Sequence, residues 1–208
     1  IAFAAGCGKE EIPEDDARFK ILASFFPIEQ FTRNVAQGAP GVEIRTLLPA
    51  DYGCPHNYSL TPRDMNSIEW ADALVVNGLG MEEFLLETAQ EADPELVIIN
   101  SSLDIHPLYS AVGHCPNPDH DHGELNPHIF ASPRHAAEQV INIAKYLSQV
   151  DSLNRDIYRQ NANLYVHKLQ QLADQFAELV MKSGNRKIVT VHDAFDYLAM
   201  ASGLEVIA

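Results

Sequence analysis

Metal-binding side chains gather in one short stretch of the chain, His114-Cys-Pro-Asn-Pro-Asp-His-Asp-His-Gly-Glu-Leu-Asn-Pro-His128. These fifteen residues contain four histidines, one cysteine and three carboxylates. Imidazole nitrogen, thiolate sulfur and carboxylate oxygen are the groups with which proteins bind transition-metal ions, including zinc. The composition of the stretch therefore predicts metal binding, and the question is which side chains belong to a rigid site.

Three of the nine histidines lie next to segments that are expected to be rigid. His56 lies in a loop after a predicted strand and follows Pro55, and His192 directly follows another predicted strand. His128 belongs to Asn126-Pro-His-Ile-Phe, just before a predicted helix. Ligands collect at the carboxyl ends of strands in open parallel sheets. Three neutral imidazoles on separate supports would suit zinc, which takes nitrogen ligands at about 2.0–2.1 Å.

The other histidines of the opening stretch alternate with carboxylates between proline and glycine residues. This composition favours a solvated loop that captures metal weakly, with auxiliary ligands from His114, His120 and His122. The alternative is a charged surface loop without a function. The remaining histidines of the chain are expected to be structural or exposed to solvent: His106, His135 and His167.

The segments that must position these histidines alternate between strands and helices. Apolar runs predict buried strands over residues 19–26, 42–48, 73–77 and 96–100, and helices are predicted over residues 27–37, 61–70 and 81–89. Uninterrupted apolar strands separated by helices indicate an α/β fold, with a parallel sheet covered on both faces.

The second half of the chain is predicted to be mainly helical before a new sheet begins. Ser132-Pro133 opens a helix that ends near residue 150, and a second helix of about thirty residues continues to Gly184-Asn185. The apolar positions of this second helix form one seam: Tyr165, Leu169, Leu172, Phe176 and Leu179. A strand at 187–191, a helix at 194–202 and a strand entering at 203 predict the start of a second α/β unit, which we expect to continue beyond residue 208.

Composition and charge narrow the classes of partner. The chain has 208 residues, of which 46% are hydrophobic, so it can bury one large core or two smaller ones. Its 14 basic and 29 acidic residues give a formal net charge of −15. Such a charge repels phosphate backbones and anionic headgroups and attracts cations. We therefore expect no nucleic-acid partner. No apolar run approaches the roughly 20 residues that span a bilayer.

The first residues resemble the end of a bacterial lipoprotein signal peptide. Ile1-Ala-Phe-Ala-Ala-Gly-Cys7 is apolar and ends in Ala-Gly-Cys, after which a charged tether continues to residue 18. We predict that Cys7 is lipidated, which would hold the protein outside the cytoplasmic membrane. The alternative is an apolar start in which this cysteine is simply buried.

Four ordered motifs resemble those of the zinc- and manganese-specific substrate-binding proteins of bacterial ABC transporters. They occupy residues 47–64, 71–82, 126–133 and 191–198. The resemblance implies two α/β lobes joined by one long rigid helix. The tether would then occupy residues 1–18, the first lobe 19–150, the helix 151–183 and the start of the second lobe 184–208.

The same resemblance implies a ligand set. His56, His128 and His192 match the three metal-ligand positions of the family that fall within this chain. Manganese members typically place a carboxylate at the third position, so a histidine there favours Zn²⁺. The fourth ligand of the family, an Asp or Glu, would lie beyond residue 208. Because neutral imidazoles bind the ion, the zinc affinity should fall as the pH drops below about 6.5.

The cysteines depart from the family pattern. Cys54 stands where many members carry an acidic or a small residue, and Cys115 lies in the histidine-rich loop. A disulfide between them, an auxiliary thiolate ligand and two unrelated buried thiols are the three possibilities.

The implied function is capture of zinc and its delivery to a membrane permease, by a monomer that is not an enzyme. The location would be lipid-anchored at the cell membrane or periplasmic. Manganese or iron binding and an adhesin-like lipoprotein of the same fold are alternatives. A zinc hydrolase with three histidine ligands is another, but the sequence contains no His-Glu-x-x-His helix and no Gly-x-Ser-x-Gly elbow.

Overall fold

A four-stranded parallel sheet forms the centre of the computed structural model, which describes residues 18–49, 55, 58–109, 125–190 and 193–207. Its strand order is β2-β1-β3-β4. The strands are β1 (Phe19–Ala23), β2 (Val42–Thr46), β3 (Ala73–Val76) and β4 (Val97–Asn100). All three strand pairs are parallel, which confirms the predicted α/β class.

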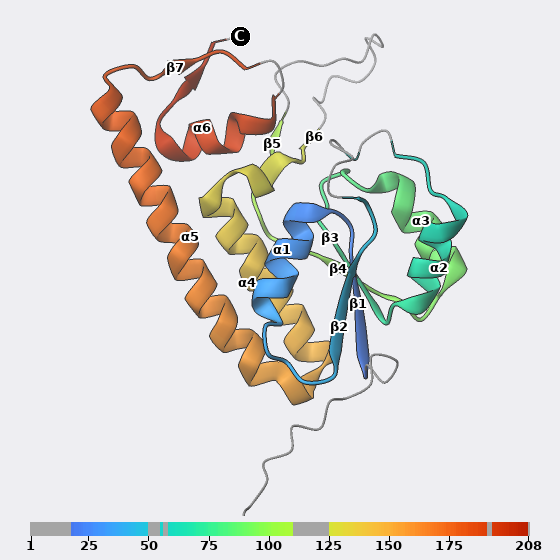
Figure 1. The fold of residues 1–208 in the computed structure, drawn as a ribbon. Coiled ribbons are helices and arrows are strands. Elements are labelled where there is room, and N and C mark those ends of the chain that lie inside the picture. The colour runs from blue at the N-terminus through green and yellow to red at the C-terminus, as the bar shows by residue number, and fades with distance from the viewer. Residues whose placement is uncertain (1–17, 50–54, 56–57, 110–124, 191–192, 208) are drawn as a thin grey trace, which may run out of the picture.

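Helices cover both faces of this sheet (Figure 1). On one side lie α1 (Phe26–Val35), α4 (Pro133–Val150) and α5 (Arg155–Ser183), and on the other α2 (Pro62–Trp70) and α3 (Glu83–Ala92). The two central strands are the most buried, and Ile21, Leu22 and Leu74 have no exposed surface. Burial of each such side chain contributes about 1.5–3 kcal/mol to folding, so the sheet is a stable support for the groups at its edge.

Helix boundaries follow local capping chemistry. The backbone N–H of Asp64 donates to the Thr61 hydroxyl, and the Asp64 carboxylate accepts from the Thr61 backbone, which starts α2 where the sequence predicts it. The strand predicted over residues 19–26 ends earlier, at Ala23. Pro27 occupies the first turn of α1, where its fixed φ favours a helix, so Phe26 becomes helical despite its apolar character.

The long helix predicted from the sequence is α5, with 29 residues. At 1.5 Å per residue it is about 43 Å long, whereas α4, which packs against it, is about 27 Å long. The last turns of α5 therefore pass beyond α4 and reach the C-terminal elements (Figure 1). Consequently the predicted apolar seam is buried only in part: Leu169 is 8% exposed, but Leu172 is 50% and Leu179 65% exposed.

Shorter elements complete the described chain. β5 (Leu108–Tyr109) and β6 (Leu125–Asn126) form an antiparallel pair that the sequence analysis did not predict. The 3-10 turns are η3 (His128–Ala131), η4 (Ser152–Asn154) and η5 (Asp193–Phe195). β7 (Lys187–Ile188) and β8 (Glu205–Val206) pair in parallel around α6 (Asp196–Ser202). We call residues 193–207 the C-terminal segment. The division of the chain into lobes stays a prediction. None of the helices in the described ranges is long and apolar enough to cross a membrane.

Candidate metal centre

Buried polar groups collect at the carboxyl ends of β1 and β3. The strand order reverses between these two strands, and such a point is where ligands bind in open α/β sheets. Ser24 follows β1 and Asn77 follows β3, and both side chains are fully buried. Glu82 joins them: its Oε1 accepts from Ser24 Oγ and from the Asn77 backbone N–H, each at 2.7 Å. Its Oε2 accepts from the Gly78 N–H at 3.0 Å. One carboxylate thus holds two strand ends together.

The Asn77 side chain connects this edge of the sheet to the segment around His128. Its Nδ2 donates to the carbonyl oxygen of Pro127 at 2.8 Å. Its Oδ1 accepts from Gln139 Nε2 of α4 at 3.0 Å, and Gln139 also donates to Ser101 Oγ at 2.8 Å. The backbone before His128 is therefore attached to both β3 and α4.

His128 is the predicted ligand that the structure describes. It begins η3, and its side chain is 4% exposed. The ring Nδ1 lies 2.9 Å from Asn126 Oδ1 and 3.6 Å from Asp193 Oδ1, and the ring centroid is 5.9 Å from that of Phe130. With an oxygen opposite, Nδ1 carries the proton and Nε2 has the lone pair that a metal ion requires. A hydrogen bond of this kind on the second nitrogen is typical of metal-binding histidines.

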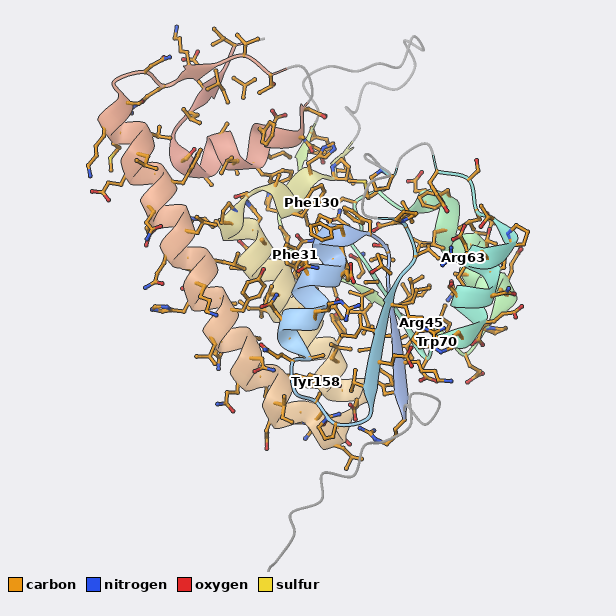
Figure 2. The ribbon with its side chains drawn as sticks, viewed as in Figure 1. Phe31, Arg45, Arg63, Trp70, Phe130 and Tyr158 are labelled. Carbon is orange, nitrogen blue, oxygen red and sulfur yellow. The ribbon has the colours of Figure 1, made fainter. Side chains whose placement is uncertain are left out.

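The C-terminal segment contacts this histidine through Asn126 and Asp193. Asn126 Nδ2 donates to the Asp193 carbonyl oxygen at 2.9 Å and to Asp196 Oδ2 at 3.2 Å. The Tyr197 hydroxyl donates to the Asn126 carbonyl oxygen at 2.7 Å. These bonds bring residues that are about seventy positions apart in the sequence into one partly buried cluster. Figure 2 shows Phe130 at this end of the molecule, beside α1, where its ring lies 5.2 Å from that of Phe25.

Most of the predicted site residues lie outside the described ranges. These are His56, His192, the loop histidines His114, His120 and His122, and the cysteines Cys7, Cys54 and Cys115. Within the described ranges, no group of three or more His, Cys, Asp or Glu side chains is placed to hold a metal ion. The three-histidine ligand set therefore stays a prediction.

The histidines expected to have no ligand role lie as predicted. His106 and His167 are exposed. His135 is buried, its Nδ1 lies 2.9 Å from Ser132 Oγ, and its ring meets that of Tyr197 edge-on at 4.9 Å between centroids. Burial, aided by the charge of Arg134, lowers the pKa of His135, so this ring stays neutral inside the fold.

Two functional candidates were missed at the level of the sequence. Asn126 had a local signal, because an asparagine two residues before a histidine can accept the histidine N–H in an Asx turn, and it does so at 3.0 Å. Glu82 had none. It precedes Glu83 in what reads as an ordinary acidic helix start, and only the tertiary structure distinguishes the buried carboxylate from the exposed one.

A family model described as zinc-uptake complex component A, periplasmic (ZnuA) matches residues 21–208. The chain belongs to this family. The family description confirms the predicted resemblance to metal-uptake binding proteins and their extracytoplasmic location.

Individual ZnuA-family relatives differ in the metal that they are named for. The chain is 30% identical over 213 residues to the zinc-binding lipoprotein AdcA of Streptococcus pneumoniae, an alignment that covers 99% of this chain and 41% of AdcA. It is 28% identical to the manganese-binding lipoprotein MntA of Halalkalibacterium halodurans, covering 98% of this chain and 65% of MntA. A crystal structure of ZnuA superposes with a TM-score of 0.77 and 28% identity over 91% of this chain and 70% of that one. The chain thus spans less than two thirds of the length of these two curated relatives.

Proposed function

We propose that the protein to which this chain belongs binds Zn²⁺ outside the cytoplasmic membrane and delivers it to an ABC-transporter permease, without catalysing a reaction. The observation that carries the proposal is His128. Its imidazole is buried at the sheet edge where ligands gather, and Asn126 accepts from its Nδ1, which places the lone pair of the ring on Nε2. Family membership supports a transport role, and the name of AdcA supports zinc.

The proposed ligands are His56, His128 and His192, with a fourth carboxylate ligand contributed by residues beyond 208. Support comes from Asp193, the residue after His192 in the sequence, whose carboxylate lies 3.6 Å from His128 Nδ1. Imidazole ligands favour zinc over manganese because manganese prefers harder oxygen ligands. Since MntA is a manganese-binding relative, metal choice has to be measured for this protein.

Two further features of the sequence complete the proposal. The loop histidines His114, His120 and His122 would capture zinc weakly before it reaches the buried site. Cys7 would carry the lipid that keeps the protein at the membrane, in line with the lipoprotein relatives AdcA and MntA.

Competitive titration with zinc, manganese and iron(II) tests this function. The protein is compared with His128→Ala, with the triple variant His56→Ala/His128→Ala/His192→Ala, and with His106→Ala as a matched change at an exposed histidine. We expect tight zinc binding in the parent and in His106→Ala. Removing a residue that only contacts a metal ligand lowers metal affinity about 10- to 100-fold. His128→Ala removes a proposed ligand itself, so it should lower the zinc affinity by more than this.

Two results would contradict the proposal. One is a triple variant that binds zinc as tightly as the parent, because the loop alone would then hold the metal. The other is zinc-dependent turnover of an ester or peptide substrate by the parent, which would make the protein a hydrolase rather than a binding protein.

A further inference from the structure

We propose that Asn126 is a positioning residue that couples the metal-binding nitrogen of His128 to the C-terminal segment. Through this amide, zinc on His128 would help to hold residues 193–197 in place, in addition to the direct hold of the proposed ligand His192, and displacement of those residues would weaken the zinc site. The inference rests on the proposed function, because it takes His128 to be a zinc ligand.

Four hydrogen bonds converge on the Asn126 amide, which is fully buried. Its Oδ1 accepts from the His128 backbone N–H at 3.0 Å and from the His128 ring Nδ1 at 2.9 Å. Its Nδ2 donates to the Asp193 carbonyl oxygen at 2.9 Å and to Asp196 Oδ2 at 3.2 Å. The oxygen end thus faces the histidine, and the nitrogen end faces the C-terminal segment.

These partners allow only one orientation of the amide. The two oxygens that face Nδ2 are acceptors, a carbonyl and a carboxylate, and the backbone N–H of His128 is a donor. If the amide were turned around, its NH₂ group would face the backbone N–H of His128, and its oxygen would face the Asp193 carbonyl and the Asp196 carboxylate. The C-terminal segment therefore determines that an acceptor faces the ring Nδ1 of His128. That acceptor keeps the proton on Nδ1 and the lone pair on Nε2.

The backbone on either side of this amide is fixed as well. The buried Tyr197 hydroxyl donates to the Asn126 carbonyl oxygen at 2.7 Å and accepts from the Leu108 N–H at 2.8 Å. On the side of the sheet, Asn77 Nδ2 donates to the Pro127 carbonyl oxygen at 2.8 Å. Figure 1 shows α6 beside β5 and β6, and η3 packs against both α4 and α6. Residues 126–128 are thus held between the sheet and α6.

Coupling follows from the chemistry of the imidazole. A metal ion on Nε2 withdraws electron density from the ring, so Nδ1–H becomes a stronger donor to Asn126. The hydrogen bond that it strengthens is the one that aligns the amide with Asp193 and Asp196. The coupling is reciprocal. If a partner binds by moving the C-terminal segment away, zinc lowers the affinity for that partner, and the partner lowers the zinc affinity by the same factor. Such factors are about 5- to 150-fold.

Two substitutions separate the two ends of the amide. Asn126→Asp keeps an acceptor for His128 but places a carboxylate oxygen against the Asp193 carbonyl and the Asp196 carboxylate, so it removes only the bridge. Asn126→Ala removes both ends. Asn161→Asp is the matched control, since Asn161 Nδ2 also donates two hydrogen bonds, to the carbonyl oxygens of Val35 and Gln37, but joins α5 to the end of α1.

The measurement is hydrogen–deuterium exchange of the full-length protein at pH 7.5, with and without saturating zinc, alongside the zinc affinity from competitive titration. In the parent and in Asn161→Asp, zinc should slow exchange in residues 193–207 at least about 5-fold. In Asn126→Asp this slowing should become smaller, because only the proposed ligand His192 then connects zinc to the segment, while the zinc affinity falls less than in Asn126→Ala. Adding Asp196→Asn to Asn126→Asp restores a donor to the bridge and should recover part of the slowing.

The outcomes distinguish this inference from the proposed function. If the parent fails to bind zinc, both fall. If the parent binds zinc tightly but the folded Asn126→Asp variant shows the parent's zinc-dependent slowing, the function stands and the coupling is wrong. A purely structural role would lower the thermal midpoint of both variants and leave the zinc-dependent difference unchanged. Asn126→Asp, which preserves side-chain volume, decides the question even where Asn126→Ala does not fold.

Discussion

At the scale of single residues, Glu82 is the buried group whose charge state depends most on the fold. Burial is the largest influence and raises the pKa of Glu82 to about 7, although hydrogen bonds from Ser24, Asn77 and Gly78 favour the ionised form. At pH values between the ordinary glutamate pKa of 4.5 and about 7, the folded protein holds a proton that the unfolded chain has released. The free energy of unfolding therefore falls as the pH rises through this window and becomes constant above it.

Glu82→Gln should remove this pH dependence. The parent is expected to lose up to about 3 kcal/mol relative to the variant between pH 4.5 and pH 7.5, because Gln does not ionise. Urea unfolding at four pH values in that range, with a chelator present, measures the difference. Glu83→Gln, at the exposed neighbour, is the control and should follow the parent. Identical pH profiles for parent and Glu82→Gln would show that Glu82 does not titrate in this window.

Gly78 permits the close approach of the strand ends beneath the site. Its φ is +86°, and an added Cβ would overlap Asn100 Oδ1 and Ser102 Oγ. Gly78→Ala should lower the free energy of unfolding by at least about 2 kcal/mol, the sum of backbone strain and overpacking. Gly38→Ala has a similar φ of +75° but nothing within 4 Å of its Cβ, so it reports the backbone strain alone. If both variants lose the same free energy of unfolding, the structure accommodates the new Cβ of Gly78→Ala beside Asn100 without a loss of stability, which would contradict the prediction.

At the scale of elements, the corner between α4 and α5 is held by Asp151. This carboxylate accepts from Arg18 at 2.9 Å, from the Tyr158 hydroxyl at 2.6 Å and from Asn154 at 2.7 Å. Figure 2 shows Tyr158 near the end of α5 that adjoins this corner. Burial alone would raise the pKa of Asp151, but the three hydrogen bonds outweigh it and lower that pKa. The resulting stability is present above the ordinary aspartate pKa of 3.8 and is lost as the pH falls through the lowered pKa.

Asp151→Asn should therefore destabilise the protein by about 1–3 kcal/mol at pH 7. This range is kept low because Arg18 is partly exposed, so solvent screens its interaction with Asp151. The neutral amide places an NH₂ group where the carboxylate accepts from three donors. Urea unfolding at pH 7 and at pH 3 measures the effect, and the difference from the parent should shrink at the lower pH. Asp156→Asn, in the exposed first turn of α5, should leave the stability within about 0.5 kcal/mol of the parent. A difference that persists unchanged at pH 3 would contradict the role of ionised Asp151.

The elements also show how far the sequence predicts this structure. Local signals predicted α2 and α4 closely, because a capping box and a proline in the first turn define a helix start without tertiary help. The pairing of β5 with β6 was not predictable, since its two-residue strands carry no periodicity and are separated in the sequence by residues 110–124. In the site, the motif predicted His128 as a ligand, which stays a prediction, whereas the bonds from Asn126 to Asp193 and Asp196 join distant segments. Such contacts follow from packing rather than from local sequence.

At the scale of the whole molecule, the charge of −15 complicates any test of zinc binding. Self-repulsion destabilises a strongly acidic fold, so any divalent cation relieves it to some extent. A specific zinc site adds a term that depends on the ratio of free metal to Kd. That term is about 2.7 kcal/mol at a hundredfold excess over Kd. Magnesium at the same concentration screens charge equally but prefers oxygen ligands and has little affinity for imidazole.

Zinc at a hundredfold excess over Kd should therefore raise the free energy of unfolding by about 2.7 kcal/mol at pH 7.5, and magnesium should raise it much less. His128→Ala should reduce the zinc response to the level of the magnesium response, because the net charge is unchanged while the ligand is lost. Urea unfolding followed by circular dichroism, with and without each metal, gives all four values. Equal stabilisation of the parent by zinc and magnesium would mean that relief of charge repulsion, rather than a buried histidine site, accounts for the effect of zinc on this fold.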